Sequence, residues 1–97
     1  MKYTINYFRE NIEKTLSGLN IMYKNFPQGD LGTLDEIVLE NSKVGVVIDY
    51  WGEGFFGVFL YDYTKKEEII NILLTPKEDV EKDKLFEQCL RYSIQYQ

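Results

Sequence analysis

The sequence has 97 residues, enough for one domain with a single core, and its 44% hydrophobic and 28% charged content is typical of a soluble globular protein. Its net charge of −5 argues against nucleic acid and anionic membrane surfaces as partners, because both attract basic proteins. The lack of histidine removes the commonest general base and the imidazole metal ligands, and the single cysteine excludes an internal disulfide or a cysteine-based zinc site.

The beginning of the chain predicts an amphipathic helix over residues 4–17. Its apolar side chains recur every three or four residues and share one stripe: Ile5, Phe8, Ile12, Leu16 and Leu19. Thr4 suits the N-cap, and Gly18 fits the left-handed position that often ends a helix. The segment lacks the apolar stretch of a signal peptide, and no apolar run approaches the ~20 residues that span a bilayer, so we expect a cytoplasmic protein.

Residues 20–35 fit more than one kind of structure. The apolar residues between Ile21 and Phe26 suit either a second short helix or an edge strand. Pro27, Gly29 and Gly32 then interrupt any regular element, which predicts a loop over residues 27–35.

Four strand-like segments follow, at residues 36–41, 44–51, 55–63 and 68–75. They are rich in β-branched and aromatic residues, and short polar or glycine-containing turns separate them. Connections this short allow only antiparallel hairpins, because a parallel pair needs a much longer crossover. The sequence therefore predicts a four-stranded antiparallel meander.

A second helix is predicted from residue 76 to the end of the sequence or near it. Thr75, Pro76 and Glu78 are the residue types expected at its N-cap, first and third positions. Its inward face is apolar: Leu85, Phe86, Cys89 and Leu90, with Ile94 as a further candidate. Both helices must cover the same side of the sheet to form one core. We therefore predict a single α+β domain over residues 1–97, a two-layer fold with N- and C-terminal helices on one face of the meander.

Alternation along the strands separates the two faces of this sheet. The side with the bulky aliphatic residues is assigned to the core: Val44, Val46, Ile48, Tyr50, Phe56, Val58, Leu60, Ile70, Ile72 and Leu74. The opposite side mixes rings, glycines and an acid: Gly45, Val47, Asp49, Trp51, Phe55, Gly57, Phe59, Tyr61, Ile69, Asn71 and Leu73. No helix remains to cover this second side. It is either a binding surface or, if the loop of residues 20–35 folds over it, a second small core.

The excess of negative charge is concentrated in the middle of the chain. Residues 30–63 carry seven acids and one base, interleaved with seven aromatic rings. Such a surface favours a basic macromolecular partner, since charge complementarity speeds association and aromatic residues supply buried contacts. The candidate partner-binding residues are Asp30, Asp35, Glu36, Asp49, Trp51, Glu53, Phe55, Phe59 and Tyr61.

The same acids give little support to catalysis or metal binding. Asp49 and Glu53 flank Trp51, which is similar to a sugar site with paired carboxylates, but acids on a hairpin are more often solvated. The acids near Gly29 and Gly32 do not have the spacing of a calcium-binding loop. We therefore expect no catalytic residues, no cofactor and no bound metal, and the reading as a small acid-using enzyme stays a minor alternative.

Three consecutive segments carry a family resemblance: residues 32–41, 44–51 and 55–63. Across roughly residues 30–75 the chain resembles bacterial toxin-immunity proteins, those paired with contact-dependent growth inhibition and related polymorphic toxins. The resemblance implies a non-catalytic cytoplasmic protein that binds one cognate toxin domain, often a nuclease, and blocks it stoichiometrically. A nuclease must bind a polyanion, so the implied toxin surface is basic, in agreement with the acidic middle of this chain. The alternative is a structural or regulatory module that self-associates through its sheet, so that a homo-oligomer is possible.

Overall fold

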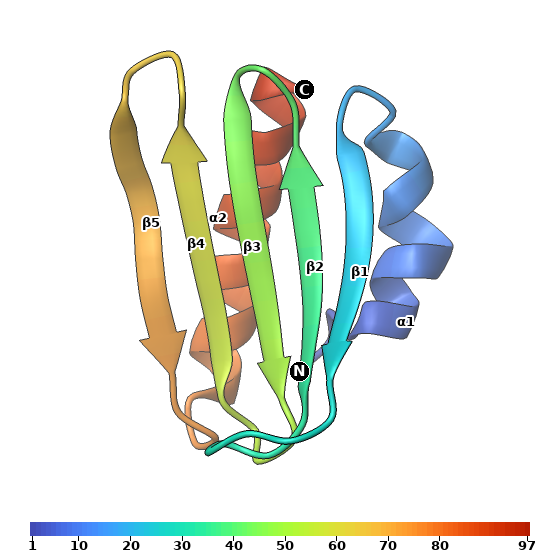
Figure 1. The fold of residues 1–97 in the computed structure, drawn as a ribbon, viewed down its shortest axis with the longest axis vertical. Helices are drawn as coiled ribbons and strands as arrows, with labels where there is room; N and C mark the ends of the chain where they lie inside the picture. The colour runs from blue at the N-terminus through green and yellow to red at the C-terminus, as the bar shows by residue number, and fades with distance from the viewer.

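The sheet contains five strands, one more than the sequence predicts. The computed structural model describes all 97 residues, with β1 at Asn20–Phe26, β2 at Leu34–Glu40, β3 at Val44–Trp51, β4 at Phe56–Asp62 and β5 at Glu67–Leu74. Each strand pairs antiparallel with the next, and the spatial order β1-β2-β3-β4-β5 is the chain order (Figure 1). The predicted α+β class and the antiparallel meander are confirmed, and the prediction of four strands is wrong by one.

The additional strand is β1, formed by the segment that fits both a helix and a strand in the sequence. It pairs with β2 along its whole length, from Asn20 opposite Glu40 to Phe26 opposite Leu34. Ile21 and Tyr23 pack against the core, whereas the side chains between and beyond them are exposed. The predicted loop is correspondingly shorter, because its last two residues, 34 and 35, already belong to β2.

The N-terminal helical segment is irregular. It begins as α1 at Ile5–Tyr7, widens into a π-helical turn over Phe8–Ile12 and tightens into a 3₁₀ turn over Glu13–Thr15. The Thr4 hydroxyl accepts a hydrogen bond from the Tyr7 N–H, as expected of an N-cap. Phe8 and Ile12 are both buried and lie four residues apart, so they share the core side of the segment.

Gly18 does not adopt the left-handed conformation that its position predicts, since the only glycines with positive φ are Gly32 and Gly54. A close approach explains the glycine instead. A Cβ at Gly18 would lie 2.8 Å from the carbonyl carbon of Gln97, and the Gln97 side chain hydrogen-bonds to the Gly18 N–H and the Thr15 carbonyl. The end of α2 therefore packs directly on the turn that follows the first helical segment.

The long helix α2 spans Asp79–Tyr96 and lies behind β3, β4 and β5. The Glu78 carboxylate accepts hydrogen bonds from both the N–H and the hydroxyl of Thr75, but the prediction of Thr75 as the N-cap is wrong, because Glu78 is the residue that precedes the helix. Regular helix begins only at Asp79, slightly later than the sequence predicts. No helix of the structure has both the length and the apolar character needed to cross a membrane.

Both helical segments pack on one side of the sheet, and Figure 1 shows α2 behind the central strands and α1 beside β1. They meet through stacked rings: Tyr3 lies 4.5 Å from Phe86, and Phe8 contacts the same ring edge-on. Two predictions about β5 are wrong. Ile72 is 43% exposed, because β5 is an edge strand that α2 covers only in part. Ile69 packs against the core, because a register shift opposite Leu60 and Tyr61 interrupts the alternation.

Candidate protein-binding face

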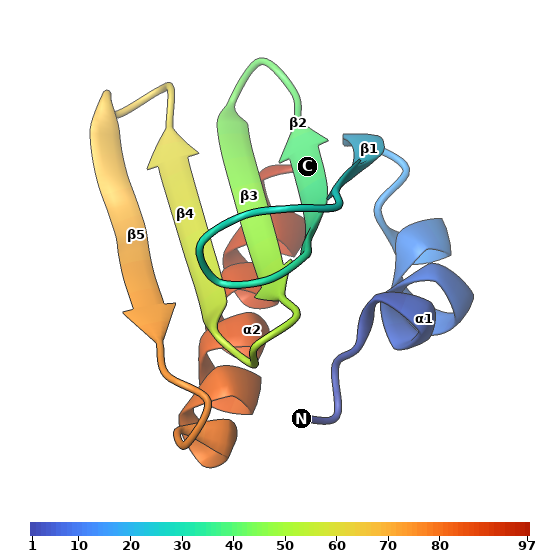
Figure 2. The same ribbon diagram turned by 60° about the horizontal axis from the view of Figure 1, so that its bottom comes forward.

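The side of the sheet away from the helices is uncovered. We call it the open face, and it is formed by the outward residues of all five strands: Asn20, Met22, Lys24, Phe26, Leu34, Glu36, Val38, Glu40, Gly45, Val47, Asp49, Trp51, Gly57, Phe59, Tyr61, Glu68, Asn71 and Leu73. The loop 27–33 crosses one end of the sheet, where it hydrogen-bonds to the β3–β4 turn through Thr33 and Leu31 (Figure 2). It leaves most of the open face accessible, and large apolar side chains stay exposed there, Met22 at 55% and Leu73 at 54%.

Two glycines allow aromatic rings to lie flat on this face. A Cβ at Gly57 would be 3.1 Å from the Trp51 ring, and a Cβ at Gly45 would be 2.5 Å from the Tyr63 hydroxyl oxygen. The Tyr63 hydroxyl also donates a 2.7 Å hydrogen bond to Glu40, which fixes its ring across β3. The glycines in these two strands are thus explained by the close approach of a ring to the backbone.

A pair of carboxylates lies at the centre of the open face. Glu36 on β2 stands directly opposite Asp49 on β3, in a row that continues to Lys24 on one side and Gly57 on the other. The Asp49 Oδ1 atom is buried and has no hydrogen-bond partner. Burial, followed by the neighbouring Glu36, raises the pKa of Asp49 to about 7. The carboxyl therefore has an unused acceptor and holds its proton up to a much higher pH than an ordinary aspartate.

Aromatic and apolar side chains surround this acid. Asp49, Trp51, Phe59 and Leu73 line one shallow hollow of about 130 Å³ on the open face. The Trp51 ring lies over Gly57, which is directly opposite Asp49 in the strand register. Chemically, the hollow can receive an apolar group together with a hydrogen-bond donor or a cation.

The structure brings together five of the nine predicted binding residues. Glu36, Asp49, Trp51, Phe59 and Tyr61 share the open face. The other four lie elsewhere, in positions described next.

Asp30 and Glu53 are exposed at the end of the sheet, in the loop 27–33 and the β3–β4 turn. Phe55 follows that turn and lines a hollow with Met1 and Lys82, next to the start of α2. Asp35 is opposite Tyr50, on the helix side of the sheet. These residues border the open face or leave it, so the predicted set is not one continuous surface.

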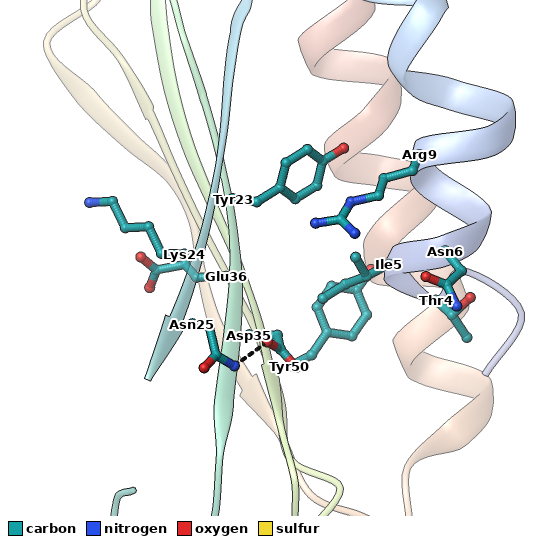
Figure 3. A pocket seen from close by; sticks show the side chains of 10 residues that line it. All are labelled: Thr4, Ile5, Asn6, Arg9, Tyr23, Lys24, Asn25, Asp35, Glu36 and Tyr50. Atoms are coloured by element: carbon teal, nitrogen blue, oxygen red, sulfur yellow. Dashed lines mark hydrogen bonds between the residues drawn. The ribbon is translucent and has the colours of Figure 1, made fainter. Parts of the chain in front are cut away.

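Asp35 belongs to a polar cleft of about 490 Å³ between the first helical segment and strands β1 and β2. Figure 3 shows Glu36 on the opposite side of the sheet from Tyr23 and Arg9, and Asn25 donating a 2.6 Å hydrogen bond to Asp35. The Arg9 guanidinium lies 4.2 Å from the centre of the Tyr23 ring. This contact stabilises the helical segment against β1.

Sequence reasoning missed the contribution of β1 to the open face. Met22, Lys24 and Phe26 extend the face by one strand, and Lys24 is its only base. The signal was present as alternation, since the residues between them, Ile21 and Tyr23, pack inward. It was weak because the segment is short and carries polar residues on both sides.

Other reactive groups of the chain are engaged in packing. Burial raises the pKa of the Cys89 thiol to about 12, which leaves it un-ionised and unreactive at neutral pH. The buried Asp62 accepts a hydrogen bond from the Tyr92 hydroxyl, which lowers the pKa of that carboxyl. No three histidine, cysteine or acidic residues lie close enough to hold a metal ion.

Comparisons with family models, with curated proteins and with solved structures found no match to this chain.

Proposed function

We propose that the protein is an immunity protein that binds a cognate toxin domain through its open face and neutralises it stoichiometrically, without turnover, in the cytoplasm. The observation that carries this proposal is the uncovered sheet face, with exposed apolar side chains around a central pair of carboxylates. The resemblance of residues 30–75 to toxin-immunity proteins supports the class of partner. A nuclease is the favoured kind of toxin, because its substrate surface must be basic.

The apolar part of the face supplies the expected binding energy. Monomeric proteins rarely leave a large contiguous apolar patch on the surface, and such patches usually mark an interface. Met22, Phe26, Phe59 and Leu73 are all exposed here. Trp51 is held in place over Gly57, so that it loses little side-chain entropy on binding.

The acids of the face select the partner by charge. Four acids lie on the open face against the single base Lys24, and two further exposed acids lie at its end; the four are Glu36, Glu40, Asp49 and Glu68. A lysine or arginine of the toxin placed over Asp49 would provide the missing hydrogen bond to its buried oxygen. Such a contact favours the ionised form of Asp49, so binding should release protons near neutral pH.

Inhibition then requires only that the open face occupy the basic surface with which the toxin binds nucleic acid. The immunity protein provides no catalytic group in this mechanism. Its acidic residues take the place of phosphates, and its apolar residues keep the complex from dissociating.

The test is to express the chain together with the product of the adjacent reading frame and to measure binding, toxicity and inhibition. Phe59→Lys changes the centre of the open face, and Val80→Lys is the matched control, an exposed apolar residue on α2. We expect Phe59→Lys to weaken the complex about tenfold or more, as for interface hot spots, and Val80→Lys to leave it unchanged. A neighbour that is neither toxic nor bound would contradict the immunity function, and loss of binding in Val80→Lys alone would contradict the choice of face.

A further inference from the structure

The two edges of the sheet differ in how they are protected. Natural edge strands are usually blocked by charges, proline or a covering element, because their free N–H and C=O groups can pair with another chain. β1 carries Lys24, is followed by Pro27 and has α1 beside it (Figure 1). β5 is less protected: it is uncharged from Ile70 to Leu74, Pro76 lies beyond the strand, and α2 covers it only in part.

The unprotected half of β5 is also its regular half. A register shift interrupts the pairing with β4 opposite Leu60 and Tyr61, and both glutamates of the strand precede it. Beyond it, residues 70–74 pair without interruption, and Ile72 and Leu73 are 43% and 54% exposed on the two sides of the strand. This segment therefore offers five residues of straight, uncharged and partly apolar edge.

We infer that β5 pairs antiparallel with β5 of a second copy of this chain, about a two-fold axis at Ile72. In this register Ile72 faces itself, Asn71 faces Leu73 of the second copy and Ile70 faces Leu74 of the second copy. Every residue from 70 to 74 is paired and no charged residue enters the interface. The two sheets become one continuous ten-stranded sheet.

Other registers of the same strands are less favourable. An axis at Asn71 places Glu68 opposite Leu74 of the second copy, and an axis at Ile70 places Glu68 opposite Ile72 of the second copy. Both arrangements desolvate a carboxylate next to an apolar side chain, which is unfavourable without a partner charge. The Ile72 axis avoids this conflict, and so the sequence of the edge itself selects the register.

The charges beside β5 are compatible with a second copy of the chain. A hollow of about 210 Å³ on the helix side of the strand is lined by Ile72, Leu74 and Leu85, together with Glu81 and Lys84 of α2. It therefore carries one acid and one base. In the dimer the two copies of this hollow lie near the two-fold axis. Each has no net charge, so the two do not repel each other, although each chain as a whole carries −5.

The first test is the mass in solution over a dilution series, by light scattering and sedimentation. We expect a species of twice the 11.5 kDa chain mass that dissociates on dilution. Ile72→Lys should be monomeric throughout, whereas Met22→Lys, the matched change at the protected edge, should behave as the wild type. A wild-type chain that stays monomeric up to roughly 1 mM would overturn the inference.

The second test determines the register of the pairing, and it remains valid even if the Ile72→Lys chain does not fold. Paired Cα atoms across antiparallel strands are about 4.5–5.5 Å apart, within the range of a disulfide. Ile72→Cys should therefore cross-link rapidly under oxidation, while Asn71→Cys, whose copies would be roughly 8 Å apart, should cross-link about tenfold more slowly. The native Cys89 is fully buried and does not compete. An Ile72→Cys chain that does not cross-link, or an Asn71→Cys chain that cross-links as fast, contradicts the proposed pairing.

Discussion

Glu36 and Asp49 face each other across β2 and β3, and one oxygen of Asp49 is buried without a hydrogen-bond partner. Like charges directly opposite each other destabilise a sheet, and a buried unpaired acceptor adds to the cost. Such a pair therefore lowers the stability of the fold. Its place at the centre of the open face is consistent with a site kept for a partner at the expense of stability.

The first prediction concerns the pH dependence of stability. The pKa of Asp49 is raised by folding from 3.8 to about 7, so the folded state binds more protons than the unfolded state between these values. Stability should therefore fall as the pH rises from about 4 to about 7. Asp49→Asn should raise the free energy of unfolding by about 1–2 kcal/mol at pH 8 and leave it unchanged at pH 4, allowing for partial solvent screening. Urea denaturation at both pH values measures the difference.

The control for this experiment is Glu53→Gln, which removes an exposed acid from the adjacent β3–β4 turn. It should show the wild-type pH profile. If Asp49→Asn were equally stabilising at pH 4 and pH 8, the raised pKa would not be the cause.

The second prediction concerns the ring that covers Gly57. Gly57→Ala places a methyl group 3.1 Å from the Trp51 ring, within a strand that cannot easily move. The ring should lift from the sheet, with a red shift in the emission of this single tryptophan and a loss of about 1 kcal/mol in stability. Gly45→Ala is the matched control, because its methyl group displaces Tyr63 and should leave the emission unchanged.

The third prediction concerns a buried lysine that joins α2 to the β3–β4 turn. Lys82 is 5% exposed and donates hydrogen bonds to the Gly54 carbonyl at 2.7 Å and to Asp79 at 3.1 Å. Lys82→Met should lower the free energy of unfolding by about 1–3 kcal/mol, because the Gly54 carbonyl loses its donor. Lys84→Met, two residues later and exposed, should change it by less than about 0.5 kcal/mol, and equal losses in thermal denaturation would argue against the role of Lys82.

The fourth prediction separates two neighbouring acids by the face on which they lie. Glu36 is on the open face, whereas Asp35 is on the helix side and is bonded to Asn25. Glu36→Lys should slow association with the toxin domain several-fold at low salt, and the effect should shrink at high salt as the charges are screened. Asp35→Asn should have little effect on the association rate. An equal effect of both changes in stopped-flow measurements would mean that the open face does not direct the encounter.

Much of the sheet could be predicted from the sequence, because alternation and short turns are local signals. The predicted segment 44–51 coincides with β3, and the β4 and β5 segments differ from the predicted ones by a residue at each end. The predictions that failed depend on distant parts of the chain. Gly18 is explained by the approach of Gln97, and the exposure of Ile72 by how far α2 extends over the edge.

The candidate site was predictable in part for the same reason. Asp49, Trp51 and Phe59 fall on one face through strict alternation within two well-defined strands. Asp35 was assigned to a loop next to Glu36, and the extension of β2 by two residues places it on the other side of the sheet. The carboxylate pair itself could not be predicted, because it depends on the register between β2 and β3.

The order of the strands has a further consequence for how the chain folds. Each strand pairs only with the strand made just before or just after it, so the hairpins close over short loops and can form rapidly. The apolar side of this sheet, however, is covered in large part by α2, which follows all five strands in the chain. During translation the part of the sheet that α2 covers therefore stays exposed until this helix has been made, and in that interval it can associate with other chains.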